Sequence, residues 1–260
     1  MNSTDSAAKV QTDYGLKPIL SGVTLEYAGK ECGKALSEDF FDAARPEAAE
    51  LSARGMVFAI ADGVSGGGGR RAAETCVYGV LSDYYAAPAA WAPAQCLDRV
   101  IGALNGWLLA QNHRSDPQHS MLSTLTVLVL HGDEFHIAHV GDCRVYRVRR
   151  RALECLTTDH VWPRRDMRNV LRRAVGLDQH LVVDCVSDQL LPDDRFVLLS
   201  DGVWEVLGEA VLREVLVEGS ASAAHAAELV DRSIVKQKAY YGRNDATAAV
   251  VHLMDLPLRA

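Results

Sequence analysis

The spacing of apolar residues predicts long amphipathic helices in two parts of the chain. Residues 72–85 and 96–112 carry apolar side chains three or four positions apart, which is the spacing of one helix face. Because these two helices are long and adjacent, we expect an antiparallel pair that covers a sheet. Further helices are predicted at residues 165–175, ended by Gly176, and at residues 203–217 and 221–241.

Short β-type runs occupy most of the remaining chain. They lie at residues 19–28, 56–61, 122–130, 134–140, 144–149, 153–156, 181–186, 195–199 and 246–254. The runs between residues 122 and 156 are separated by turn-like pairs such as Gly132-Asp133 and Gly141-Asp142, a pattern typical of a meander of antiparallel hairpins. A helix pair, a meander, a second helix pair and a closing strand together predict an α+β fold.

Composition then limits the size and the partners of the protein. The chain has 260 residues, 48% of them apolar, and no internal repeat, so we expect one domain at 19–260 behind a loose arm at 1–18. The net charge of -7 does not favour nucleic acid or an anionic membrane as a partner, and no apolar run approaches the ~18 residues of a membrane span. The arginine clusters at 147–151 and 164–173 are expected to be solvated.

Six cysteines without a CxxC pair, and no signal peptide, predict free thiols in the cytoplasm.

Acidic residues at the ends of predicted strands are the main chemical signal. Asp62, Asp142 and Asp201 each follow a strand, Asp245 precedes the last strand, and Glu38 and Asp39 precede a short apolar pair. Carboxylates at strand ends suit hard, oxygen-ligated cations such as Mg²⁺ or Mn²⁺. Each acid alone would also serve in a turn or a helix cap, so spacing does not establish that they converge.

The stretch from residue 63 to residue 67 offers a competing hypothesis, because it reads G-x-S-x-G between a strand and a helix. In an α/β-hydrolase such a turn presents a nucleophile, here Ser65, with Asp201 and His252 as the acid and the base. The antiparallel character of the middle region disfavours this serine hydrolase, as does the place of His252 inside an apolar strand. A phosphate-binding P-loop is excluded at this stretch, because no Gly-Lys-Ser/Thr follows the glycines.

Seven short motifs, taken in order, resemble those of the metal-dependent Ser/Thr protein phosphatases of the PP2C (PPM) family. They are Lys34-x-x-Ser-Glu-Asp39, Ala61-Asp-Gly-Val-Ser-Gly66, Ser123-Thr-Leu-Thr126, His139-Val-Gly-Asp-Cys-Arg144, Leu156-Thr-Thr-Asp-His160, Leu199-Ser-Asp-Gly-Val203 and Asn244-Asp-Ala-Thr247. Each motif is weak alone, but together they span nearly the whole chain. The segment at 29–108 looks most like bacterial members that are fused to a protein kinase.

The resemblance implies a fold and a set of site residues. The fold is two antiparallel β-sheets packed face to face with helices outside each, a four-layer αββα sandwich. By resemblance, Asp62 bridges two metal ions, the Gly63 carbonyl binds one of these ions, and Asp201 binds the first. Asp142 and Asp201 together hold a weaker third ion. Glu38 and Asp39 hold metal-bound waters, and Lys34 binds phosphate.

The resemblance also implies the reaction. Two or three Mn²⁺ or Mg²⁺ ions would supply a hydroxide that hydrolyses phosphoserine or phosphothreonine without a phosphoenzyme intermediate. The expected partner is a phosphorylated protein, either a cognate Ser/Thr kinase or the target of that kinase.

The chain departs from the family pattern in four places. Lys34 stands in place of an arginine, Val64 in place of a histidine, and the segment at 161–171 is shorter than in many members. The fourth departure is the pair Asn244-Asp245, since the family has Asp-Asn there and its aspartate binds the first metal. Either Asn244 ligates through its amide oxygen or a backbone shift lets Asp245 reach the site. A neutral ligand would weaken metal binding, so the alternative function is a pseudophosphatase that binds a phosphoprotein or kinase without efficient turnover.

Overall fold

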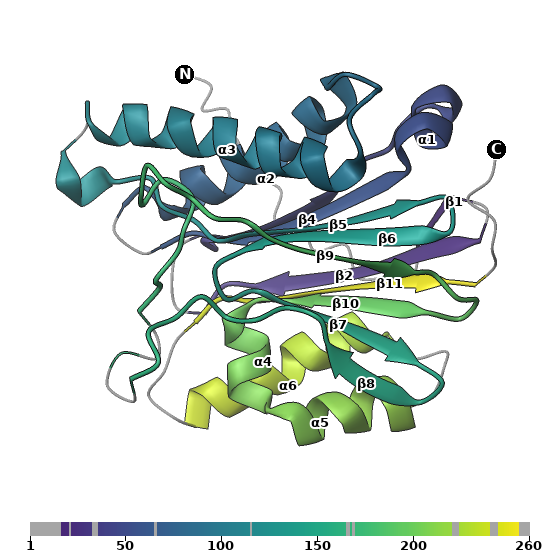
Figure 1. Cartoon of the computed structure of the whole chain (residues 1–260). Helices are drawn as coiled ribbons and strands as arrows, with labels where there is room; N and C mark the ends of the chain where they lie inside the picture. The colour runs from purple at the N-terminus through teal and green to yellow at the C-terminus, as the bar shows by residue number, and fades with distance from the viewer. Residues whose placement is uncertain are drawn as a thin grey trace, which may run out of the picture.

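The protein is built from two packed antiparallel β-sheets with helices on both outer faces, as the computed structural model shows (Figure 1). The structure describes residues 17–20, 22–32, 36–64, 67–114, 116–164, 167, 170–219, 224–239 and 244–254. The α+β sandwich predicted from the sequence is therefore confirmed. Of the arm expected at 1–18, residues 1–16 lie outside this part, while Lys17 and Pro18 begin a strand.

Each sheet combines strands from distant parts of the chain. The first sheet has the order β1 (Lys17–Leu20), β2 (Val23–Lys30), β11 (Ala246–Leu253), β10 (Arg195–Leu199), β7 (Arg144–Arg149) and β8 (Ala152–Cys155). The second sheet has the order β3 (Asp39–Ala43), β4 (Met56–Asp62), β5 (Leu125–His131), β6 (Glu134–Val140) and β9 (Asp184–Gln189). All strand pairs are antiparallel.

The helices cover the outer faces of the sheets. The helices and helical turns are α1 (Ala48–Arg54), α2 (Gly69–Ala86), α3 (Pro93–Asn112), η1 (Pro117–His119), α4 (Asp201–Leu207), α5 (Glu209–Arg213), η2 (Glu214–Glu218) and α6 (His225–Ala239). The expected pair α2 and α3 packs on the second sheet, while α4, α5 and α6 pack on the first (Figure 1). A third apolar layer lies between the sheets and includes Phe58, Phe135 and Phe196. Within the described residues, none of the helices combines the length and the apolar character that crossing a membrane requires.

The meander predicted between residues 122 and 156 is wrong at the connection between β6 and β7. β6 and β7 match the predicted bounds to the residue, but they do not pair with each other. β6 pairs with β5 and β9 in the second sheet, whereas β7 pairs with β10 and β8 in the first. The turn at Gly141 and Asp142 is therefore a crossing between sheets, which the alternation of side chains alone does not reveal.

Other predicted elements differ in extent or in kind. The described residues of the expected helix at 165–175 form no helix, because Leu171 bridges to Val161 and Val175 bridges to Ser123 through backbone hydrogen bonds. The strand expected at 19–28 is two strands with a turn at Gly22, whose φ is 86°. The helix expected at 203–217 is interrupted at Gly208, and α1 was not predicted.

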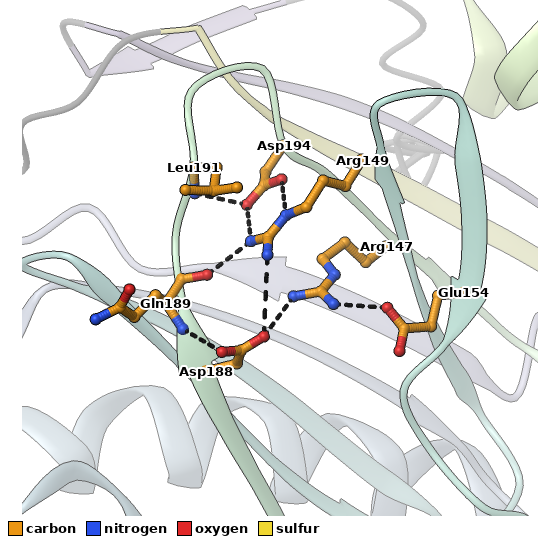
Figure 2. Close-up of polar contacts among 7 residues, drawn as sticks. All are labelled: Arg147, Arg149, Glu154, Asp188, Gln189, Leu191 and Asp194. Carbon is orange, nitrogen blue, oxygen red and sulfur yellow. Dashed lines mark hydrogen bonds and ion pairs between the residues drawn. The ribbon is translucent and has the colours of Figure 1, made fainter.

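The arginine cluster at 147–151 is only partly solvated, contrary to the prediction. Arg147 and Arg149 lie two apart on β7, so both side chains point to the same side of the sheet. Arg147 is 9% exposed and donates to Asp188 of β9 at 2.8 Å, which joins the two sheets (Figure 2). Arg149 donates to both carboxylate oxygens of the fully buried Asp194, at 2.7 and 2.6 Å. These arginines therefore stabilise the edge between the sheets.

Candidate metal centre

Asp39 and Asp62 are brought together by the register of two neighbouring strands. β3 and β4 pair antiparallel with Asp39 directly opposite Asp62, which places their side chains on one face. The Asp62 N–H donates to Thr124 Oγ1 at 2.7 Å, and its carbonyl accepts from the Thr124 N–H at 2.8 Å. Ser123 Oγ donates to the same carbonyl at 3.1 Å. The main chain of Asp62 is thereby fixed at the end of the second sheet.

Gly63 must be glycine because two backbone segments meet there. Its N–H donates to the Glu38 carbonyl at 3.1 Å, and it forms a bridge with Ser123. A Cβ atom at this position would lie 2.1 Å from the carbonyl oxygen of Gly69, the first residue of α2. A side chain would therefore push the start of α2 away from the end of β4.

Asp201 reaches the same place from the first sheet. It is the first residue of α4, directly after β10. The preceding Ser200 is tied to β11, because its N–H donates to the Thr247 carbonyl and its Oγ accepts from the Thr247 N–H, both at 3.0 Å. Asn244 Nδ2 donates to Asp201 Oδ2 at 2.7 Å. Asp201 and Asn244 thus form one polar pair at the end of the first sheet.

Asp142 lies in the crossing between the two sheets. Gly141 before it has a φ of 112°, a conformation that L side chains rarely adopt. The Asp142 side chain is buried, and its carbonyl accepts from Trp204 Nε1 of α4 at 2.9 Å. Trp204 in turn lies under the guanidinium of Arg144, 3.4 Å from Cζ to the ring centroid. These contacts place Asp142 beside the start of α4.

Burial, together with neighbouring carboxylates, raises the pKa of each of the four aspartates. Burial raises the pKa of Asp39 to about 7 and of Asp142 to about 8, and the Asp201 carboxylate adds to both shifts. Burial and the Glu205 carboxylate raise the pKa of Asp201 to about 6. Burial and the carboxylates of Asp39 and Asp201 raise the pKa of Asp62 well above its usual value. This end of the sheets therefore disfavours accumulated negative charge unless a cation is present.

The donor set fits a divalent cation of the hard, oxygen-preferring kind. Asp39 Oδ2 and Asp201 Oδ1 are buried and, in the structure as described, accept no hydrogen bond. Buried carboxylate oxygens without partners are costly, and metal coordination would satisfy them. Among the described residues, no group of three or more His, Cys, Asp or Glu side chains is arranged so that it could hold a metal ion by itself. Mg²⁺ keeps several waters and is bound through only one or two carboxylates, so a smaller set of acids suits it.

Comparisons with known proteins find relatives in sequence and in fold. No protein-family model matches the chain. The serine/threonine phosphatase stp of Listeria monocytogenes is 25% identical over 211 residues, covering 74% of this chain and 82% of that relative. The solved catalytic domain of the serine/threonine protein phosphatase PstP, in complex with 2 manganese ions, superposes with a TM-score of 0.70 at 24% identity, over 90% of this chain and all of that one. Stp1 from Staphylococcus aureus gives a TM-score of 0.74 at 17% identity, over 89% and 95% of the two chains.

The fold is that of the bacterial PP2C-type phosphatases. The resemblance inferred from the seven motifs is thereby confirmed. Within this fold, the residues predicted from those motifs can be compared with the geometry one by one.

The pair Asn244-Asp245 divides between two tasks. Asn244 turns its side chain toward Asp201. Asp245 is buried, and its two carboxylate oxygens accept the backbone N–H groups of Cys32 at 2.9 Å and Glu38 at 2.8 Å. Asn244 is thus the member of the pair whose side chain contacts Asp201.

Three further predicted residues lie elsewhere or outside the described part of the chain. Lys34 falls outside the described residues, as does Ser65. His252 does not approach Asp201: Leu199 of β10 pairs with Ala248 of β11, whereas His252 pairs with Arg195 at the other end of the same strands. Its Nε2 lies 3.8 Å from Asp193. The Asp201–His252 arrangement of a serine hydrolase is therefore not formed.

Sequence reasoning missed two polar residues on α6. Ser233 and Gln237 are both buried, although their side chains are polar. They lie four apart on the face that carries Leu229 and Val230, so a polar pair interrupting an apolar stripe was the available signal. Both contact the main chain beside Asp201.

Proposed function

We propose that this chain is a metal-dependent protein phosphatase that hydrolyses phosphoserine and phosphothreonine, with its catalytic domain at residues 19–260. The observation that carries the proposal is the meeting of Asp39, Asp62 and Asp201 from two sheets, with a buried, unpartnered oxygen on Asp39 and on Asp201. The manganese named for the PstP structure and the activity named for the Listeria relative support the same reading.

The chain's own residues would divide the work as follows. Asp62 and Asp201, the Gly63 carbonyl and the Asn244 side chain would hold the Mn²⁺ or Mg²⁺ ions. Glu38 and Asp39 would orient metal-bound waters, Asp142 would bind a further ion with Asp201, and Lys34 would bind the substrate phosphate. The bound ions supply an activated water and offset charge on the phosphoryl oxygens. This chemistry needs no phosphorylated nucleophile on the protein, so Ser65 is given no catalytic role.

The expected substrate is a phosphorylated protein, because a phosphatase of this type acts on protein-bound phosphoserine or phosphothreonine. We further propose that it is a cognate Ser/Thr kinase or the target of that kinase. All six cysteines are free thiols, four of them buried, which supports a reducing cytoplasm as the site of action.

Hydrolysis of p-nitrophenyl phosphate and of a phosphothreonine peptide tests the proposal. Activity should require Mn²⁺ or Mg²⁺ and stop with EDTA. Asp62→Asn and Asp201→Asn should each lower kcat/KM by at least about 100-fold, since loss of a ligand costs more than loss of a group behind it. Asp231→Asn, an exposed residue of α6, serves as the control. Turnover that persists in EDTA or in either site variant would overturn the mechanism.

A second candidate is a pseudophosphatase, and the neutral Asn244 facing Asp201 favours it. In that case calorimetry would detect binding of Mn²⁺ and of a phosphopeptide, while no phosphate would be released at any Mn²⁺ concentration. Phosphate release at millimolar Mn²⁺ would decide for the enzyme.

A further inference from the structure

Two buried polar side chains of helix α6, Ser233 and Gln237, contact the main chain next to the candidate metal centre. Ser233 is fully buried and Gln237 is 5% exposed. Because they lie four residues apart, they share one helix face. Buried amide and hydroxyl groups are costly unless they are hydrogen-bonded, so their partners indicate what they do.

Gln237 binds both polar groups of one residue's main chain. Its Oε1 accepts the Asn244 N–H at 2.6 Å, and its Nε2 donates to the Asn244 carbonyl at 2.9 Å. Two such bonds fix the position of Asn244 and also the rotation of its backbone. Asn244 itself is exposed, so packing of its side chain does not determine where it lies.

The same face of α6 also contacts the residue after Asp201. Gln237 Nε2 lies 3.2 Å from the Gly202 carbonyl and 3.2 Å from Ser233 Oγ, and Ser233 Oγ donates to the same carbonyl. Gly202 packs directly on the main chain of Asp245, since a Cβ atom at position 202 would lie 2.0 Å from the Asp245 carbonyl oxygen. Gln237 therefore joins the start of α4 to the chain before β11.

We propose that Gln237 is a positioning residue, which sets where Asn244 lies against Asp201 and thereby sets the affinity of the site for its divalent cation. The inference deepens the proposed function and rests on it. The 2.7 Å contact between Asn244 and Asp201 is the link through which Gln237 acts. Gln237 itself does not touch the cation or the substrate.

Gln237→Met tests the inference because methionine keeps the length of the side chain but removes its hydrogen bonds. We expect Mn²⁺ binding, measured by calorimetry, to weaken by roughly 10- to 100-fold, the usual effect of losing a group that orients a ligand. kcat at saturating Mn²⁺ should change much less than the Mn²⁺ concentration for half-maximal rate. Gln95→Met makes the same chemical change at an exposed position of α3 and should bind Mn²⁺ like the wild type.

A double-mutant cycle with Asn244→Ala separates positioning from simple structural support. If Gln237 acts through Asn244, Gln237→Met should weaken Mn²⁺ binding no further in the Asn244→Ala background. The inference would be overturned, with the proposed function left standing, if Gln237→Met bound Mn²⁺ within twofold of Gln95→Met and only its melting temperature were lower. Additive effects of the two substitutions in the cycle would overturn it as well. Failure of the wild type to bind Mn²⁺ would overturn the proposed function and this inference with it.

Discussion

Asn244 and Asp245 illustrate how two adjacent residues can exchange roles at a site. Consecutive side chains of an extended chain point in opposite directions, so only one of them can face Asp201. The structure gives that position to the neutral amide, and it uses the carboxylate to accept two backbone N–H groups from the loop before β3. The carboxylate of this pair therefore contacts the loop before β3, and the neutral amide contacts Asp201.

Asn244→Asp should restore the charge facing the ion. We expect Mn²⁺ affinity to rise by on the order of tenfold, because ligand charge tunes the affinity of such sites. In EDTA the same change should lower the melting temperature by about 2–4 °C, because a further carboxylate meets Asp201 without a cation. Calorimetry with Mn²⁺ and thermal unfolding with and without the ion measure both effects.

Asp245→Asn is the companion variant. It leaves an amide NH₂ facing one of two backbone donors, so it should lower the melting temperature both with and without Mn²⁺. A gain in stability in EDTA for Asn244→Asp, or an unchanged Mn²⁺ affinity, would contradict the assignment of Asn244 to the site.

At the residue scale the sequence predicted a set of candidate acids but not how they meet. The motif order identified Asp62, Asp142 and Asp201. The pairing of Asp39 with Asp62 depends on strand register, which a one-residue slip would reverse, and a single sequence does not specify it. The choice between Asn244 and Asp245 depends on tertiary contacts: Asn244 is bound by Gln237 of α6, and Asp245 accepts from Cys32, 213 positions away in the sequence.

At the scale of elements, the strands with strong alternation or continuous apolar character were predicted well, and their partners were not. β4, β6, β7 and β10 lie where expected. The switch of sheet between β6 and β7 escaped prediction because both sheets bury an inner face, so the pattern of one strand fits either. The helical spacing at 165–175 was outweighed by backbone pairing of Val175 with Ser123. Tertiary contacts decided the structure there rather than local propensity.

The junction of α4 with β11 gives a prediction at this scale. Gly202→Ala would place a Cβ 2.0 Å from the Asp245 carbonyl oxygen, so α4 or β11 must move. We expect a loss of roughly 1–3 kcal/mol in the free energy of unfolding, as for other overpacked positions, together with weaker Mn²⁺ binding. Chemical denaturation and calorimetry measure the two quantities.

Gly106→Ala on α3 is the matched control, because a Cβ there meets nothing within 4 Å. It should stabilise the protein by about 0.5–1 kcal/mol through helix propensity and leave Mn²⁺ binding unchanged. If Gly202→Ala behaved like Gly106→Ala, the close packing of α4 on β11 would not be what fixes Asp201.

At the scale of the whole molecule, the two sheets are joined differently at their two ends. The acids of the metal centre meet at one end, where their mutual repulsion opposes close packing. Arg144 and Arg149 mark the two ends of β7, roughly 17 Å apart at 3.4 Å per residue. Near Arg149, ion pairs between opposite charges join β7 to β9 and to the turn before β10 (Figure 2). The ion pairs of the arginines and the acids of the candidate metal centre therefore lie at opposite ends of β7.

Asp194→Ala tests this separation. It removes a buried carboxylate that accepts two hydrogen bonds from Arg149 and one from the Leu191 N–H, the last at 2.8 Å. We expect the free energy of unfolding to fall by on the order of 3 kcal/mol, because the arginine and the turn both lose their partner. Asp231→Ala breaks an exposed ion pair with Lys30 and should cost less than about 1 kcal/mol. Below the melting temperature, Asp194→Ala should keep the Mn²⁺ affinity and kcat of the wild type. A fall in either quantity without unfolding would show that the arginine network and the metal centre are coupled through β7.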